Sequence, residues 1–317
     1  MKSYKISEQE AGVRLDKFVQ QKAPLLPSGL MHKYFRLKRF KVDNRRGLPS
    51  QKLGAAQLVQ LYINDEFFLK INNSLPFLKY PATVDVVFED KNIIIMNKPA
   101  GLLTQSETED NLEYRMRHYL HKTGGYDPKV HRFLPSLAHR IDRNTSGIII
   151  AAKNHKSLEI LNEKLKAHEI SKFYLCLAHG IIEPPSATIK AYLKKNQRLK
   201  RVFIYDNPLP DTKEIITKYD VLASCHDKSL LEVELITGRT HQIRAHMAYI
   251  DHPLLGEGKY AKNAEDKRLG FKHQALCSYK IRFDFTTDAE LLNYLNGKEF
   301  KLDNVWFKDK FERGFSQ

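Results

Sequence analysis

The residues whose types and order best suit chemistry form one short stretch, residues 139–147, with the sequence His-Arg-Ile-Asp-Arg-Asn-Thr-Ser-Gly. The five apolar residues that follow, 148–152, predict a buried strand, whereas Asn-Thr-Ser-Gly predicts a tight turn before it. We therefore expect Asp142 on a loop at the mouth of a core strand. The neighbouring Arg140 and Arg143 favour the charged form of its carboxylate. Such a carboxylate can act as a nucleophile or a base, although an Asp between arginines also forms ordinary surface ion pairs.

The same stretch resembles the signature of the RluA-type pseudouridine synthases, in which the motif's Asp is the catalytic residue. The resemblance implies that Asp142 is catalytic. It also implies substrate or RNA contacts from other polar residues of the motif, which are His139, Arg140, Arg143 and Thr145. A protein kinase catalytic loop begins with His-Arg too, but there Asp follows Arg directly and a Gly-rich phosphate loop precedes it. Neither feature is present here, so a kinase is excluded.

A second motif lies in a predicted core strand, residues 172–180, with the sequence Lys-Phe-Tyr-Leu-Cys-Leu-Ala-His-Gly. From spacing alone, Tyr174 would be an ordinary core residue. The Lys-x-Tyr pattern nevertheless resembles the family's second motif, whose Tyr stacks on the target base and is placed to help move its proton. An aromatic ring with a polar tip suits both tasks. The resemblance therefore implies a catalytic role for Tyr174.

A cationic cluster lies at a predicted strand-to-helix junction, in residues 237–247. Because a helix amino terminus carries partial positive charge, this junction is a good anion site. Its sequence, Gly-Arg-Thr-His-Gln-Ile-Arg-Ala-His, resembles the family's third motif, which implies that Arg244 pairs with the catalytic Asp142. The same resemblance assigns RNA contacts to Arg239, His241 and Gln242. A plain phosphate-binding helix start is the alternative.

Two later blocks depart from the family pattern, because Glu257 stands where Asp is usual and Cys277 stands where His is usual. These departures put details around the site in doubt, not the reaction. Cys277, Cys176 and Cys225 are widely separated and odd in number, which supports neither a disulfide framework nor a zinc knuckle. We expect three reduced, buried thiols and no metal site.

The overall composition favours a polyanionic partner. The chain has 317 residues, is 42% apolar, and carries 52 Lys and Arg against 37 Asp and Glu, a net charge of +15. RNA, DNA or an anionic membrane surface would each suit this charge. The amino terminus lacks the apolar core of a signal peptide, and no apolar run is long enough to span a membrane. We therefore expect a cytoplasmic protein that is large enough for more than one domain.

Basic charge is concentrated in residues 1–64, which hold 13 Lys and Arg against 4 Asp and Glu, a net charge of +9. Apolar spacing predicts a helix near residues 13–19 and another over 28–38, followed by a short strand and a basic turn. This order resembles the small RNA-binding module first known from a small-subunit ribosomal protein. The resemblance implies RNA contacts from Arg36, Lys41 and Arg45. A small basic helical cap is the alternative.

We expect three segments: a small basic RNA-binding domain over 1–64, a linker over 65–82 and a catalytic domain over 83–317. The catalytic domain opens with a hairpin closed by Lys98-Pro99-Ala100-Gly101, which resembles a loop that lies near the family's active cleft. Lys98 is therefore expected to contact the substrate. Residues 188–224 predict the strands 202–205 and 214–221, with basic residues that either hold RNA backbone or are only solvated.

The resemblance implies an α+β fold with a central mixed, mainly antiparallel sheet flanked by helices. It also implies an RNA pseudouridine synthase that turns a uridine out of the RNA stack into a pocket. No metal, nucleotide or redox cofactor is needed. The expected target is large-subunit ribosomal RNA, with transfer RNA second, and we expect a monomer without an obligate protein partner. The alternatives are a non-catalytic RNA-binding or ribosome-assembly factor and a hydrolase that uses Asp142 on a nucleoside.

Overall fold

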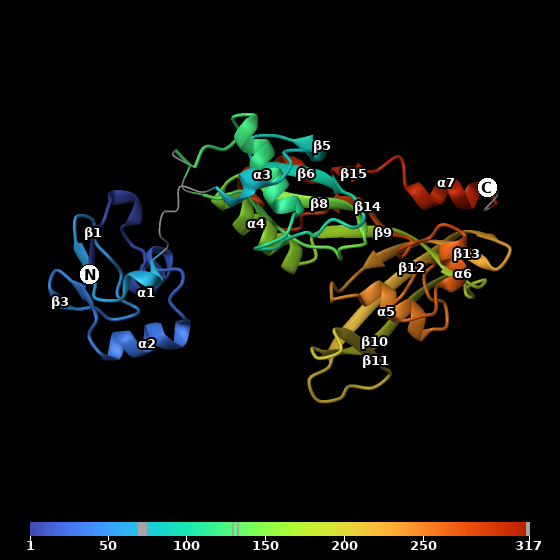
Figure 1. Cartoon of the computed structure of the whole chain (residues 1–317), viewed down its shortest axis with the longest axis horizontal. Helices are drawn as coiled ribbons and strands as arrows, with labels where there is room; N and C mark the ends of the chain where they lie inside the picture. The colour runs from blue at the N-terminus through green and yellow to red at the C-terminus, as the bar shows by residue number, and fades with distance from the viewer. Residues whose placement is uncertain (69–74, 129, 132, 315–317) are drawn as a thin grey trace. The chain divides into compact units, whose positions relative to one another are not determined.

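The computed structural model describes residues 1–68, 75–128, 130–131 and 133–314 (Figure 1). The chain divides into two compact units, Met1–Pro76 and Phe77–Gln317. Both units combine helices with sheets, so the expected α+β class is confirmed. Within the described residues, no helix has the length and apolar character that crossing a membrane requires.

The first unit has a four-stranded sheet in the order β1-β4-β2-β3, with two helices. Its elements are β1 (Lys2–Lys5), η1 (Glu8–Glu10), α1 (Leu15–Lys22), α2 (Ser28–Arg36), β2 (Phe40–Val42), β3 (Arg45–Arg46), β4 (Leu58–Leu61) and η2 (Asp65–Phe67). Leu15, Phe18 and Val19 are fully buried because their spacing places them on one face of α1. The rings of Phe35 and Phe40 meet edge to face with centroids 4.6 Å apart, which joins α2 to the sheet.

The first unit continues beyond residue 64, the expected end of the small basic domain. Phe68 is 2% exposed and belongs to the core that contains Phe18 and Phe40. Phe77, at the beginning of the second unit, is also buried, at 3% exposure. Residues 69–74 of the expected linker lie outside the described residues. The boundary in the structure therefore follows Pro76.

The second unit is built on a sheet of eleven strands whose main path is β11-β10-β12-β13-β9-β14-β8-β6-β5, with β15 paired to β14 and β7 paired to β8. The elements up to β9 are η3 (Pro76–Lys79), β5 (Asp85–Glu89), β6 (Ile93–Lys98), α3 (Leu112–Lys122), β7 (Ser136–Leu137), β8 (Ser146–Ala152), α4 (His155–Lys166) and β9 (Ile170–His179). The rest are β10 (Ser186–Asn196), β11 (Arg201–Tyr205), β12 (Lys213–Cys225), β13 (Lys228–Leu235), α5 (Gln242–Tyr249), α6 (Ala264–Arg268), β14 (Leu276–Phe283), η4 (Glu290–Leu295), β15 (Glu299–Lys301) and α7 (Trp306–Glu312). Within the described residues, all pairings between the strands of this sheet are antiparallel except that of β14 with β8, so the expected mixed, mainly antiparallel sheet is confirmed.

Helices cover the two ends of this sheet. Figure 1 shows α3 and α4 beside the strands β5, β6 and β8, and α5 and α6 beside β10 to β13. The helices α3 and α4 begin directly after Asn111 and Asn154, which each accept a hydrogen bond from a backbone amide in the first helical turn. Ile148 and Ile150 of β8 pack in one core cluster with Leu161 of α4.

The parallel junction between β8 and β14 determines where the Asp142 loop ends. Gly147 has φ +117°, and a Cβ atom built on it would lie 2.2 Å from the backbone oxygen of Ser278. A side chain cannot fit there, so only glycine lets β8 approach β14 this closely. The loop that carries Asp142 therefore enters the sheet at a fixed point.

Two expectations from the sequence are corrected by the structure. Residues 186–196 form the long strand β10, which was not expected. Ala191 and Leu193 are buried, Tyr192 between them is half-buried, and Lys190 and Lys195 are exposed. The basic composition of this segment obscured its alternating apolar pattern. Cys176 and Cys277 are buried thiols as expected, but Cys225 is half-exposed because it lies at the end of β12, beside a turn.

Candidate active site

The three motifs that the sequence singled out meet around one cavity of about 290 Å³. Its wall is formed by the Asp142 loop, by β9 and by the junction between β13 and α5. The expected site residues that line it are His139, Arg140, Asp142, Thr145, Tyr174, Arg239, His241, Gln242 and Arg244. Among the described residues, no group of three His, Cys, Asp or Glu side chains is arranged to hold a metal ion.

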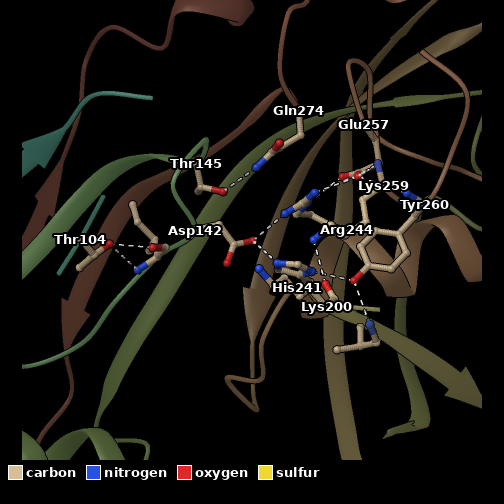
Figure 2. A network of polar contacts seen from close by, with 12 residues as sticks. Thr104, Asp142, Thr145, Lys200, His241, Arg244, Glu257, Lys259, Tyr260 and Gln274 are labelled. Atoms are coloured by element: carbon tan, nitrogen blue, oxygen red, sulfur yellow. Dashed lines mark hydrogen bonds and ion pairs between the residues drawn. The ribbon is translucent and has the colours of Figure 1, made fainter. Parts of the chain in front are cut away.

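Asp142 and Arg244 are in direct contact, although 102 positions separate them in the chain (Figure 2). Nη1 of Arg244 donates to Oδ2 of Asp142 at 3.0 Å, and Nε2 of His241 lies 3.8 Å from the same oxygen. The Asp142 side chain is 26% exposed. In the part of the chain that the structure describes, no hydrogen bond engages Oδ1 of Asp142. One carboxylate oxygen is therefore anchored, and the other is available to a molecule in the cavity.

Arg244 is itself held by a buried carboxylate. Its Nε and Nη2 atoms donate to the two oxygens of Glu257 at 2.7 and 2.9 Å, and Glu257 is completely buried. The amides of Lys259 and Tyr260 also donate to Glu257, at 2.7 and 3.3 Å. Burial by itself would lower the pKa of Arg244, but the hydrogen bonds and charges of Glu257 and Asp142 outweigh it and raise that pKa. Arg244 is therefore a permanent cation, and its planar guanidinium group has a fixed direction.

Burial by itself would raise the pKa of Glu257, but the paired guanidinium and the two amides hold it below its usual range. The carboxylate is therefore charged, and four donors from Arg244 and the backbone satisfy it. A Glu in place of the family's usual Asp is compatible with a bidentate contact to Arg244.

The backbone of the Asp142 loop is fixed on both sides. The hydroxyl of Thr104 donates to the carbonyl of Ile141 at 2.7 Å, and the amide of Thr145 donates to the carbonyl of Asp142 at 3.1 Å. Thr145 is 2% exposed, and its hydroxyl accepts from Nε2 of Gln274 at 3.3 Å. These contacts leave the Asp142 side chain little freedom to leave the cavity.

The structure corrects the expected role of Lys98 as a substrate-contacting residue. Its side chain is completely buried and lies outside the cavity lining. Its ammonium group donates to the carbonyls of Pro99, Leu102 and Arg143, at 3.0, 2.7 and 2.9 Å. Burial lowers its pKa to about 8, although the charge of Asp142 opposes this shift. Lys98 thus ties the end of β6 to the Asp142 loop.

His139 supports the loop as a neutral ring. Its Nε2 atom accepts a hydrogen bond from the amide of Ile150 at 3.1 Å, which requires an unprotonated nitrogen. Burial, together with the charge of Lys172, lowers its pKa to about 3. The side chain therefore helps to attach the motif to β8.

Tyr174 forms part of the cavity wall on β9 and is 6% exposed. Burial raises the pKa of its phenol, and the nearby charge of Asp142 raises it further. The ring is therefore neutral at physiological pH and keeps its hydroxyl proton. Because Tyr174 and Asp142 line the same cavity, a molecule in that cavity can touch both.

The junction before α5 is organised by Gln242, which is 2% exposed. Its Oε1 atom accepts from the amide of Arg239 and the hydroxyl of Thr237, at 3.0 and 2.9 Å. Its Nε2 atom donates to β12, at the carbonyl of Ile216 and the hydroxyl of Thr217. Both polar atoms of the Gln242 side chain are therefore hydrogen-bonded within the protein. The side chain of Arg239 remains exposed at the cavity rim.

Besides Lys98, one expected site residue of the second unit lies outside the cavity. Arg143 is outside its lining and pairs with Glu109 at 2.8 Å, where both side chains are at least half exposed. Arg36, Lys41 and Arg45 belong to the first unit. Thr104, Gln274 and Tyr260 had not been expected to support the site. No local pattern marks Thr104, whereas Tyr260 and Gln274 lie in the two blocks already noted around Glu257 and Cys277.

The comparisons with known proteins indicate one family. The RNA pseudouridylate synthase family matches residues 92–249, which include all three motifs. An uncharacterized RNA pseudouridine synthase of Mycoplasma genitalium is 31% identical over 96% of this chain and 96% of its own length. A ribosomal large subunit pseudouridine synthase C of Haemophilus influenzae is 30% identical over 93% of this chain and 90% of its own length. The solved human RNA pseudouridylate synthase domain containing 4 shares the fold, with a TM-score of 0.58 and 18% identity over 73% of this chain and 92% of that one.

Proposed function

The chain belongs to the RluA-type RNA pseudouridine synthases, which are isomerases acting on RNA, and from this premise we propose that Asp142 is its catalytic residue and large-subunit ribosomal RNA its substrate. The reaction breaks the bond between uracil and ribose, turns the base, and joins the sugar to carbon 5. A positioned carboxylate suits this exchange because carbon 1 of the ribose becomes electron-poor when the bonding electron pair leaves with the uracil, and a carboxylate can attack or stabilise that carbon.

The observation that carries the proposal is the asymmetric environment of the Asp142 carboxylate. Arg244 fixes Oδ2 at 3.0 Å, while the side chain remains 26% exposed toward the cavity. Oδ1 can therefore approach a nucleotide without breaking the contact that orients the group. Three chemical roles fit this arrangement: attack on the sugar, addition to the base, and removal of a proton.

We propose that the target uridine leaves its stack before it reacts, because a cavity of about 290 Å³ suits one nucleoside and not a helix. Turning a base out costs on the order of a few kcal/mol. Contact with the ring of Tyr174 would offset part of this cost, since base–aromatic stacking stabilises by about 1–3 kcal/mol. Arg140 and Arg239, exposed at the cavity rim, are suited to the flanking phosphates.

We propose that the first unit supplies a further RNA contact. It carries most of the excess positive charge of the chain. Arg36 and Arg46 line a second cavity, of about 280 Å³, together with His32. Arg45 is exposed beside it on β3, and the ammonium of Lys41 lies 5.0 Å from the ring centroid of Tyr62. This basic surface has the chemistry of a phosphate-binding module, in keeping with the expected resemblance to a ribosomal-protein module.

The choice of large-subunit ribosomal RNA rests on the relatives. Those from Haemophilus influenzae and Pasteurella multocida, each 30% identical, are named ribosomal large subunit pseudouridine synthase C. We further propose that the enzyme works in the cytoplasm as a monomer and without a cofactor. A transfer RNA remains the second candidate substrate.

Pseudouridine mapping tests this proposal. The maps of all cellular RNA are compared between cells with the gene, cells without it, and cells that carry the Asp142→Asn variant. We expect one or more pseudouridines of large-subunit ribosomal RNA to vanish without the gene and to return only with the wild-type chain. Loss of a site in transfer RNA alone would contradict the ribosomal target. Identical maps in all three strains would support a non-catalytic RNA-binding factor.

A further inference from the structure

Tyr260, which lies outside the three motifs, is connected to the active site by its contact with His241. Oη of Tyr260 lies 2.7 Å from Nδ1 of His241, and the other ring nitrogen of His241 lies 3.8 Å from Oδ2 of Asp142 (Figure 2). The same hydroxyl oxygen accepts from the amide of Val202 on β11 at 3.2 Å. A continuous chain of polar contacts therefore runs from the backbone of β11 to Asp142.

The partners of this hydroxyl determine where the protons are. The amide of Val202 can only donate, so it occupies one lone pair of the Tyr260 oxygen. Burial raises the pKa of Tyr260, so the hydroxyl keeps its own proton at neutral pH. Among the described residues, the partner placed to accept that proton is Nδ1 of His241. The histidine must then carry its proton on Nε2, the nitrogen that faces Asp142.

The Tyr260 ring is held from several sides, so its hydroxyl has a fixed direction. The guanidinium carbons of Arg201 and Arg244 lie 5.3 and 5.7 Å from the ring centroid. The His241 ring meets it edge to face, with centroids 5.8 Å apart. His241 itself has φ 54°, a left-handed backbone conformation that few non-glycine residues adopt. Strained backbone conformations are found at functional sites, where they fix the direction of a side chain, in this case that of His241.

We propose that Tyr260 is a positioning residue that fixes His241 in its neutral form with the proton on Nε2, so that His241 presents a hydrogen-bond donor to the cavity beside Asp142. This inference rests on the proposed function. This Nε2–H group is placed to orient the Asp142 carboxylate or to donate a hydrogen bond to a carbonyl oxygen of the uracil. Because Tyr260 is anchored on Val202, the docking of the hairpin formed by β10 and β11 becomes part of the active-site geometry.

The charges that face His241 come from several elements, and their effects oppose one another. Burial of the ring is the largest influence and lowers its pKa; Arg244 and Lys259 also lower it, whereas Asp142 and Glu257 raise it, and the net result is a lowered pKa. Donation from the Tyr260 hydroxyl favours the neutral ring further, because Nδ1 can be protonated only when that hydrogen bond is given up. Removal of the hydroxyl should therefore raise the pKa of His241.

The first experiment measures the proton position without relying on activity. The full chain is labelled with ¹⁵N-histidine, and long-range ¹H–¹⁵N spectra are recorded against pH, with His241→Gln used to identify the His241 signals. The wild type should show Nε2 protonated and Nδ1 bare at neutral pH. In Tyr260→Phe, which keeps the ring and loses the hydroxyl, both neutral forms should be populated. Its titration midpoint should rise by about half to one pH unit, the scale of one lost hydrogen bond.

The second experiment measures turnover, with unmodified large-subunit ribosomal RNA labelled with tritium at carbon 5 of uridine as the probe. Tyr260→Phe should release tritium about 3- to 10-fold more slowly at neutral pH, and the acid limb of its pH–rate profile should move upward with the His241 midpoint. Tyr205→Phe, which removes a hydroxyl from β11, the strand that contains Val202, is the matched control and should behave as the wild type.

Two results would overturn the proposal. One is a wild-type His241 that is protonated on Nδ1 at neutral pH. The other is a Tyr260→Phe variant whose His241 proton position, midpoint and pH–rate profile all match those of the wild type. Failure of the wild type to release tritium would instead contradict the proposed substrate, and the ¹⁵N spectra would still decide the role of Tyr260.

Discussion

The buried contact between Glu257 and Arg244 gives a quantitative prediction for the Glu257→Gln variant. The change keeps the size of the side chain and removes its charge, so two hydrogen bonds, at 2.7 and 2.9 Å, lose a charged acceptor. The Arg244 side chain is 9% exposed and that of Glu257 is 0% exposed, so water cannot replace the lost partner. Breaking a buried ion pair by removing one member costs about 3–5 kcal/mol. We expect the lower end, about 3 kcal/mol, because Asp142 still pairs with Arg244.

Urea unfolding followed by the fluorescence of the single tryptophan, Trp306, measures this loss in the second unit, where Trp306 begins α7. The midpoint of thermal unfolding should fall by roughly 6–12 °C. The matched control is Glu109→Gln, which makes the same chemical change in the exposed pair with Arg143, where both side chains are at least half exposed. The control should cost less than about 1 kcal/mol. If both variants lose equally little stability, the proposed importance of burial at Glu257 is refuted.

Two further variants test other parts of the molecule. Replacement of Arg36, Arg45 and Arg46 together by Gln should weaken RNA binding, as measured by filter binding. The slope of log affinity against log salt concentration should become shallower by up to about three units, because three phosphate contacts are lost. An unchanged slope would show that the first unit does not contact phosphates. His139→Gln keeps an acceptor for the amide of Ile150 but cannot be protonated. Because the pKa of His139 lies at about 3 in the folded chain, against about 6.5 in the unfolded one, the unfolded chain binds the proton first as pH falls, and folding loses stability below about pH 6.5. Between pH 7 and pH 5 the wild type should therefore lose about 1–2 kcal/mol more unfolding free energy than His139→Gln, in paired urea titrations. Equal losses would contradict a neutral His139 in the folded chain.

Local sequence signals predicted the elements that carry the site. The side chains of Asn111 and Asn154 cap α3 and α4, and such a cap depends on only a few neighbouring residues. The apolar run after the Asp142 loop forms β8, the buried strand that its composition indicated. The strand β10 was missed because its lysines mask the alternation of the buried Ala191 and Leu193 with more exposed residues.

Contacts between distant residues could not be derived from spacing. The approach of Arg244 to Asp142 depends on the path of the chain through β9 and β13, and resemblance alone indicated it in advance. For Lys98 the resemblance gave the wrong position, because a lysine in a loop near a cleft is expected to face solvent. Its ammonium instead satisfies three backbone carbonyls in the interior, a result that depends on the fold of the surrounding loops.

The most direct test of the central claim is the turnover of a purified Asp142→Asn variant. Asn keeps the shape of Asp142 and removes the charge that the reaction requires. Tritium release from labelled ribosomal RNA should fall by a factor on the order of a thousand or more, the scale seen when a nucleophile is removed, while RNA affinity stays within about threefold of the wild type. An Asp142→Asn variant that releases tritium at the wild-type rate would show that another group performs the chemistry.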